Sequence, residues 1–231
     1  MNSQRIAGFV LLLAAGTAPA QDPKQQLQEK MAAVKQSMAE NQARLLQYSW
    51  TETIEISLKG EVKKREQNEC RYGPDGKVVK TPIGGGGAGE KSGGKKRGLK
   101  GRIVANKIED MKEYMDRVSS LIHRYVPPDP QAMQAAFQAG RASIDKASGS
   151  LIFHDYAKPG DRVTLSLDPA AGKLRSFNVD TYLDSPQDKV TLTARFSALA
   201  DGASFLEETL LNAAAKEIQI KTTNFGHRKA G

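Results

Sequence analysis

The sequence predicts an α+β protein in which a curved antiparallel sheet, a half-barrel, packs against an N-terminal helix and a central helical hairpin. From Leu151 to Phe225, apolar residues such as Val163, Leu165 and Leu167 alternate with polar ones, and this period of two is typical of strands. Turn sequences rich in Pro, Gly and Asp separate the runs, which indicates an antiparallel meander. Upstream, apolar residues recur every three or four positions and predict the helices.

The first twenty residues have the form of a cleavable export signal. Arg5 precedes an apolar run from Ile6 to Ala15, and small residues follow at Ala18-Pro19-Ala20. A membrane-spanning helix needs about 20 apolar residues, so this run is too short to be an anchor. We therefore expect cleavage after Ala20, a periplasmic or secreted location, and a single α+β domain over residues 21–231.

The first part of that domain reads as a helix followed by three strands. From Lys24 to Gln47 a narrow apolar stripe predicts an amphipathic helix that packs on the sheet, with a coiled-coil partner as the alternative. The stripe consists of Leu27, Met31, Val34, Met38 and Leu45. Strict alternation from Tyr48 to Leu58 then predicts a strand, and residues 61–72 and 77–82 complete a first meander.

Residues 84–98 contain eight Gly with Lys and Arg interspersed, which predicts a flexible loop. A phosphate-binding loop is not expected, because Glu90 stands where such loops place Lys directly after Gly. The window from Glu61 to Arg102 carries twelve basic and five acidic residues, so the basic excess is local. The expected interaction surface is Lys91, Lys95, Lys96, Arg97, Lys100 and Arg102, facing an anionic membrane surface or an acidic protein partner.

The central segment predicts two helices. Apolar residues with helical spacing, including Met111, Met115 and Tyr125, run up to Pro127-Pro128, which ends the first helix. Asp129-Pro130 opens the second, which is expected to continue through Ile144 to about Gly149.

Residues 203–211 fit either a strand or a helix, with the strand favoured, and a frayed tail is expected from Asn224 onward.

No catalytic constellation is apparent. His123, His154 and His227 lie apart without metal-site spacing, and no Gly-x-Ser-x-Gly sequence is present. The basic window has only Tyr72 as a base-stacking aromatic, so nucleic acid is not an expected partner. The expectation is a protein that is not an enzyme, with no cofactor and no metal. The single Cys70, in phase with Val62 and Tyr72, is interpreted as buried rather than reactive.

In its layout the chain resembles periplasmic lipoprotein carriers of the LolA and LolB type, and more closely exported bacterial proteins whose function is unassigned. The resemblance rests on the order of elements from Tyr48-Ser-Trp50 onward and on turn sequences such as Arg71–Gly76, Tyr125–Pro130 and Lys158–Asp161. It implies a lipid or a lipoprotein acyl chain as ligand, held in an apolar cavity. The ligand-binding residues would then be Trp50, Ile54, Ile56, Met111, Met115, Leu165, Leu167, Phe177 and Phe196.

Two alternatives remain open at this point. The apolar sheet face is either the wall of such a cavity or a filled core, and the Met residues fit both. The protein is expected to be a cell-envelope protein that binds an apolar ligand without catalysis; the alternative is an envelope interaction or assembly protein that docks through its basic segment 63–102.

Overall fold

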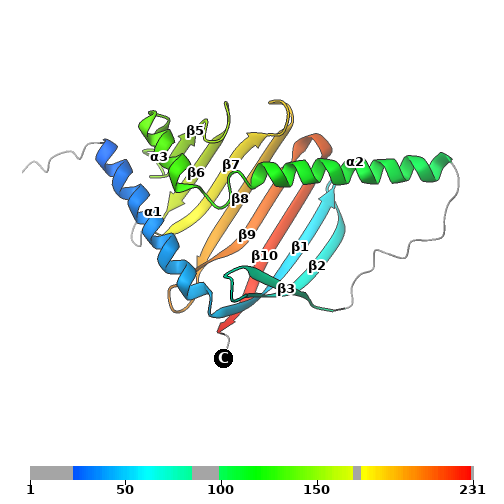
Figure 1. Cartoon of the computed structure of the whole chain (residues 1–231), viewed down its shortest axis with the longest axis horizontal. Helices are drawn as coiled ribbons and strands as arrows, with labels where there is room; N and C mark the ends of the chain where they lie inside the picture. The colour runs from blue at the N-terminus through cyan, green and yellow to red at the C-terminus, as the bar shows by residue number, and fades with distance from the viewer. Residues whose placement is uncertain (1–22, 85–98, 169–172, 230–231) are drawn as a thin grey trace, which may run out of the picture.

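A computed structural model describes residues 23–84, 99–168 and 173–229 and shows one large open antiparallel sheet with three helices (Figure 1). The helices are α1 (Pro23–Leu45), α2 (Leu99–Ile122) and α3 (Pro130–Gln138). The strands are β1 (Tyr48–Leu58), β2 (Glu61–Tyr72), β3 (Val78–Pro82), β4 (Ala142–Ile144), β5 (Leu151–His154), β6 (Arg162–Leu167), β7 (Leu174–Tyr182), β8 (Lys189–Ala198), β9 (Ser204–Ala213) and β10 (Ile218–Lys229). No helix of the described part is long and apolar enough to cross a membrane.

The two predicted groups of strands form a single sheet because β1 pairs with β10. The strand order is β3-β2-β1-β10-β9-β8-β7-β6-β5-β4, and every neighbouring pair is antiparallel. Each strand except β10 and β1 therefore pairs only with strands next to it in the sequence. The β1–β10 pair, from Leu58↔Ile218 to Tyr48↔Lys229, closes the long gap in sequence between the two meanders.

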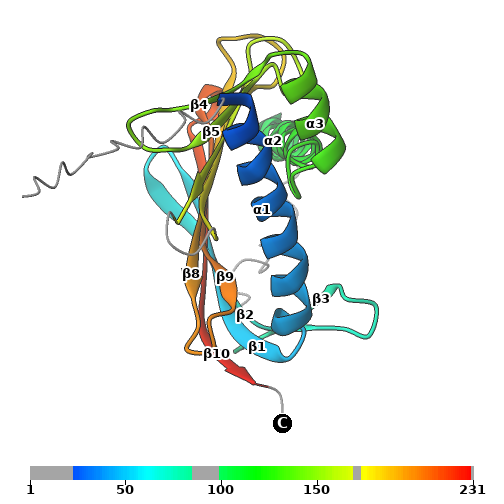
Figure 2. The ribbon, with the colours of Figure 1, turned by 90° about the vertical axis from the view of Figure 1, so that its left-hand side faces the viewer.

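The two faces of the sheet have different chemistry. Figure 2 shows α1, α2 and α3 on one side, which we call the helix-bearing face. The opposite, helix-free face carries cross-strand ion pairs in place of a packed layer, as expected for a solvated face. These pairs are Arg162–Asp180, Arg65–Glu55, Arg228–Glu69, and Glu208 with both Arg195 and Lys221.

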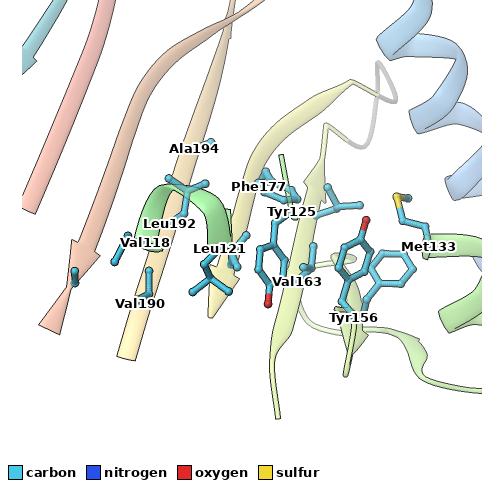
Figure 3. Packing of buried hydrophobic residues seen from close by; sticks show 14 of the residues in the cluster. Val118, Leu121, Tyr125, Met133, Tyr156, Val163, Phe177, Val190, Leu192 and Ala194 are labelled. Carbon is cyan, nitrogen blue, oxygen red and sulfur yellow. The ribbon is translucent and has the colours of Figure 1, made fainter. Parts of the chain in front are cut away.

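Helix α2 crosses the strands of the helix-bearing face and contributes to the core that the strands build. Its most buried residues are Tyr114, Val118 and Leu121, followed by Tyr125 just after the helix. They face the inward residues of β5 to β8, including Val163 and Phe177, as Figure 3 shows. The predicted helix is confirmed, but Met111 and Met115 lie at the border of this stripe and are only partly buried.

Helix α3 is shorter than the sequence predicts, and the central helices do not form a hairpin. Asp129 caps α3 by accepting from the Gln131 amide at 2.8 Å, and the helix ends at Gln138 because Gly140 takes a φ of +70°. Residues Ala142–Ile144 then pair with β5 as strand β4. Figures 1 and 2 show α3 crossing the direction of α2, and α3 packs on β4 and β5.

Helix α1 lies diagonally across the helix-bearing face and is held by polar side chains (Figure 1). Lys30 donates to the carbonyl of Gly149 at 2.8 Å. Nearer the end of α1, the Asn41 amide donates to the carbonyl of Ser204 and accepts from its N–H. Asn41 thus pairs with the first residue of β9 in the way a neighbouring strand does. Of the apolar stripe predicted for α1, Leu27, Met31, Val34 and Met38 have side chains outside the described set.

The last part of the described chain forms the paired strands β9 and β10. Residues 204–213 form β9, so the favoured strand interpretation is correct. The expectation of a frayed tail is wrong up to Lys229, because β10 stays paired with β1 as far as Tyr48↔Lys229. Gly226, with a φ of +65°, allows the register shift between Ser49 and Thr51 that keeps this pairing in place.

Among the described residues the sheet ends at β3, and this edge carries features that disfavour pairing with another chain. Two hydrogen bonds at the ends of the β2–β3 pair fix which residues of β3 face β2: Gly73 donates to the Lys77 carbonyl at 2.7 Å, and Ile83 donates to the Gln67 carbonyl at 2.9 Å. Because hydrogen-bonded and non-hydrogen-bonded residues alternate along an antiparallel strand, the backbone groups of Val78, Lys80 and Pro82 point outward. Pro82 has no N–H to offer. Lys80 turns its side chain inward. Both are devices that natural edge strands use to avoid extension of a sheet.

Asp161 joins the helical layer to the sheet. Its carboxylate, 2% exposed, accepts from the Tyr125 hydroxyl at 2.7 Å and from three backbone amides of its own loop, those of Tyr156, Ala157 and Lys158. Tyr125 also bonds Thr181 of β7 at 2.8 Å. The pKa of Tyr125 is raised, chiefly by burial, so its hydroxyl keeps its proton and remains a donor.

We expect Asp161→Ala to lower the free energy of unfolding by about 3 kcal/mol or more, because it leaves several buried donors without an acceptor. Urea unfolding followed by circular dichroism measures this. The matched control is Asp75→Ala, in an exposed turn, which should change stability by less than about 0.5 kcal/mol. Equal unfolding midpoints for the two variants would contradict the proposed role of Asp161.

Candidate functional site on the helix-bearing face

The predicted ligand-binding residues of the sheet all lie on the helix-bearing face, but they fall into two environments. Leu165 and Phe177 are fully buried in the core under α2 and α3. Leu167 and Phe196 are partly buried and pack against the edge of that core. Ile54 and Ile56 are also partly buried but lie outside the core cluster. The core half of this face is therefore filled, whereas the β1 half is partly exposed.

The partly exposed half defines an open apolar surface across β1, β10, β9 and β8. Its members share the helix-bearing face by register: Ile56 pairs with Ile220, Ile220 with Leu211, and Phe196 with Leu206. None of them is fully buried within the described part of the chain. The open apolar surface consists of Ile54 and Ile56, which lie outside the core cluster, and of four partly buried residues that pack against the border of that cluster: Phe196, Leu206, Leu211 and Ile220. A bound apolar group would remove the exposed part of these side chains from water, which lowers the free energy.

A polar group ends this surface on the side of β2 and β3. Glu52, only 7% exposed, follows Ile54 on the same face of β1. Lys80 of β3 donates to both of its carboxylate oxygens at 2.8 Å, and Asn68 of β2 donates at 3.2 Å. The carboxylate is thus fully paired, as a buried charge must be.

An aromatic group follows Glu52 toward the other end of β1. The Trp50 ring lies 5.2 Å from Tyr72 and is stacked at 5.8 Å on His227, which also contacts Phe205 at 4.0 Å. The Trp50 indole N–H donates to Asn224 at 3.0 Å. The contact of His227 with Trp50 could not be predicted from the sequence, because His227 lies in the stretch expected to fray and only the pairing of β10 with β1 brings it to Trp50.

Cys70 is buried between these groups, as the sequence predicts. It pairs with Trp50 in the register and is 0% exposed. Burial raises the pKa of its thiol, and the nearby charge of Glu52 raises it further. The expectation that Val62 shares its face is wrong, because a register shift between Ile56 and Ser57 turns Val62 to the helix-free face, where it is 53% exposed.

The predicted basic interaction surface lies outside the described part of the structure. Lys91, Lys95, Lys96 and Arg97 are outside the described ranges, and the side chains of Lys100 and Arg102 on α2 are also outside the described set. Met111 and Met115 lie on α2 and pack, partly buried, against the core.

Two clefts open on the described surface, and neither is lined by a predicted ligand-binding residue. One, of about 400 Å³, lies between α2 and the turns at Asp184 and Ala215. The other, of about 480 Å³, lies at the ends of β5 to β8. The described residues contain no group of three or more His, Cys, Asp or Glu side chains placed to hold a metal ion.

Fold and face together define an α+β protein with an open sheet that carries its helices on one face, where some apolar side chains are only partly buried in the described part of the chain. No family model matches the sequence, and none of the curated proteins matches it. Among solved structures, the chain is similar to a DUF1329 family protein from Desulfovibrio piger, with a TM-score of 0.40 and 10% identity over 90% of this chain and 94% of that chain. A similarity this low carries no information on ligand or activity.

The His227 ring gives stability a defined pH dependence. Burial lowers its pKa in the folded chain, so below a pH of about 6.5 the unfolded chain binds the proton more readily. The contribution of neutral His227 is therefore complete above about pH 6.5 and declines as the pH falls through the lowered pKa. Urea unfolding between about pH 7.5 and about pH 5.5 measures this, with NMR titration of the ring. His227→Phe, which cannot be protonated, should show the smaller loss; an unchanged loss would assign the effect elsewhere.

The Cys70 thiol should react slowly in the folded protein. Because it is fully buried and its pKa is raised by burial, neither access nor thiolate formation favours attack on a water-soluble disulfide reagent. We expect the rate at mildly alkaline pH to be far below that of the same protein in denaturant, which is the internal control. Fast native labelling would show that the β1–β2 region opens readily.

Proposed function

We propose that this chain is a non-enzymatic cell-envelope protein that binds an apolar ligand, a lipid or a lipoprotein acyl chain, on the open apolar surface of its helix-bearing face. The proposal rests on a difference in burial between apolar side chains of the same sheet face. Side chains such as Leu165 and Phe177 are sealed by α2 and α3, whereas Ile54 and Ile56 follow the same strand alternation yet stay partly exposed.

The order of side chains along β1 supports an amphiphilic ligand. On the helix-bearing face this strand presents Leu58, Ile56 and Ile54, then Glu52 with Lys80, then Trp50. Strand residues rise about 3.3 Å each, so this sequence spans about 26 Å. A hydrocarbon chain would lie along the isoleucines, and a polar head group would lie near the Glu52–Lys80 pair, whose ammonium side chain is 46% exposed.

The envelope location rests on the export signal predicted at residues 1–20, which precedes the described part of the chain. A leader of this kind would direct the chain to a compartment where free lipids and lipoproteins need shielding from water. The same signal is compatible with secretion. Retained lipid in protein purified from the cell envelope, detected by native mass spectrometry, would be direct support.

Binding of a fluorescent fatty-acid analogue to the delipidated protein tests the proposal. We expect Ile56→Asn to weaken binding about ten-fold, equivalent to about 1.4 kcal/mol, because it places an amide where the chain would lie. Val62→Asn is the matched control: it makes a similar apolar-to-amide change on the same hairpin, but on the helix-free face.

Urea unfolding of both variants separates loss of the site from loss of the fold. The proposal fails if the wild-type protein neither binds the analogue nor retains lipid, or if both variants weaken binding equally while remaining folded. It is supported if only Ile56→Asn weakens binding.

A further inference from the structure

A polar cleft of about 480 Å³ lies on the helix-free face, on the opposite side of the sheet from the open apolar surface. Its floor is made by residues that alternate with buried ones such as Val163, Val179 and Val190, and therefore point away from the helices. The main floor residues are His154, Arg162, Asp180, Tyr182, Lys189 and Thr191. Two loops, residues 155–161 and 183–188, form its rim.

The floor residues form a row at right angles to the strands. His154 of β5 pairs with Arg162 of β6, Arg162 with Asp180 of β7, and Asp180 with Thr191 of β8. Neighbouring strands lie about 4.8 Å apart, so the row extends about 14 Å. It offers donors and acceptors in alternation across four strands.

The centre of the row has unused hydrogen-bonding groups. Arg162 donates through Nε at 3.3 Å and through Nη2 at 3.0 Å, and both bonds end on the same oxygen, Oδ2 of Asp180. Within the described chain, Nη1 of Arg162 and Oδ1 of Asp180 have no bond to another residue. The His154 ring and the Lys189 ammonium are exposed and likewise have no side-chain partner among the described residues. The cleft therefore presents donors and an acceptor side by side.

The rim loop is held in one conformation. Tyr182 donates its hydroxyl to the Pro159 carbonyl at 2.8 Å, and Lys158 lies 3.7 Å over the Tyr182 ring while donating to the carbonyls of Tyr182 and Leu183. Asp155 takes a φ of +48°, which costs free energy in a residue other than Gly, and its carboxylate accepts from the Gly160 amide at 2.6 Å. The buried carboxylate of Asp161 also accepts hydrogen bonds from backbone amides of this loop. A rim fixed in this way lowers the entropic cost of binding.

The charges in the cleft are balanced, which restricts the ligand. An anion would face Asp155 and Asp180, and a cation would face Arg162 and Lys189, so neither sign finds a uniformly favourable potential. A hydroxyl group both donates and accepts, so adjacent hydroxyls on one ligand can use Arg162 Nη1 and Asp180 Oδ1 together. The rings of Pro159, Pro186 and Tyr182 add apolar contacts for the C–H faces of such a ligand.

From this geometry we propose that the cleft on the helix-free face binds a neutral, hydroxyl-rich ligand, an uncharged saccharide. The row from His154 to Thr191 runs across the strands, so it fits an extended oligosaccharide better than a single sugar. This site is independent of the proposed lipid site because the two lie on opposite faces of the sheet.

Isothermal titration of the full chain with cellotetraose and with fully N-acetylated chitotetraose, both uncharged, tests the proposal, and NMR of the His154 ring locates the site. Because the cleft is open, we expect a Kd of about 1 mM for at least one of them, with a shift of the His154 signals. Arg162→Gln should weaken this binding about ten-fold through loss of the donor beside Asp180. Arg195→Gln is the matched control: Arg195 is also an exposed arginine in a cross-strand ion pair on this face, but it lies outside the cleft.

Three results would overturn the proposal: no binding of either neutral tetrasaccharide at several millimolar, equal effects of the two arginine variants, or tighter binding of tetragalacturonate than of the neutral sugars. Fatty-acid binding should be unaffected by Arg162→Gln. Failure of the saccharide site is therefore distinguishable from failure of the proposed lipid function.

Discussion

The buried carboxylate of Asp161 is the constraint on which the arrangement of helices and sheet depends. A charge at 2% exposure is tolerated only because four donors surround it, and these donors come from its own loop and from Tyr125 at the end of α2. Through Tyr125 the same network reaches Thr181 of β7. One group thus positions the loop, the end of the helix and the sheet. Directional bonds of this kind fix the place where α2 crosses the sheet, which apolar contact alone leaves less defined.

On either side of this crossing point the helix-bearing face differs in burial. The buried core is formed by residues of β5 to β8, together with Ala213 of β9 and Ile218 of β10, whereas Ile54 and Ile56 of β1 lie outside it. The helix-free face shows no such division, since cross-strand ion pairs are distributed over its strands from β6 to β2. Each exposed pair contributes little stability, but together they keep this face in water. The sheet therefore has one face for apolar contacts and one for polar contacts.

Alternation and turn residues predicted the strands well, because both are local properties of the chain. The single sheet and the buried state of Cys70 also followed from them. Local pattern could not show which half of the apolar face is covered: Ile54 and Leu165 have the same alternating neighbours, and only the position of α2 separates them. For the same reason Asp161 looked like an ordinary turn residue. The end of β10 and His227 were missed because their polar sequence becomes a strand only through pairing with β1, and α3 ends early because Gly140 favours a turn.

The β3 edge described above also affects the unliganded protein. An open sheet with a partly exposed apolar face is at risk of associating with copies of itself, first through its edges and then through its face. Pro82 removes a donor from the outer edge of β3, and the inward turn of Lys80 places a charge beside the apolar residues of β1. The same lysine that pairs with Glu52 thus also limits self-association. Removing it would affect colloidal behaviour and would also leave the buried Glu52 carboxylate without its cation, so solubility and the pairing of Glu52 depend on a single side chain.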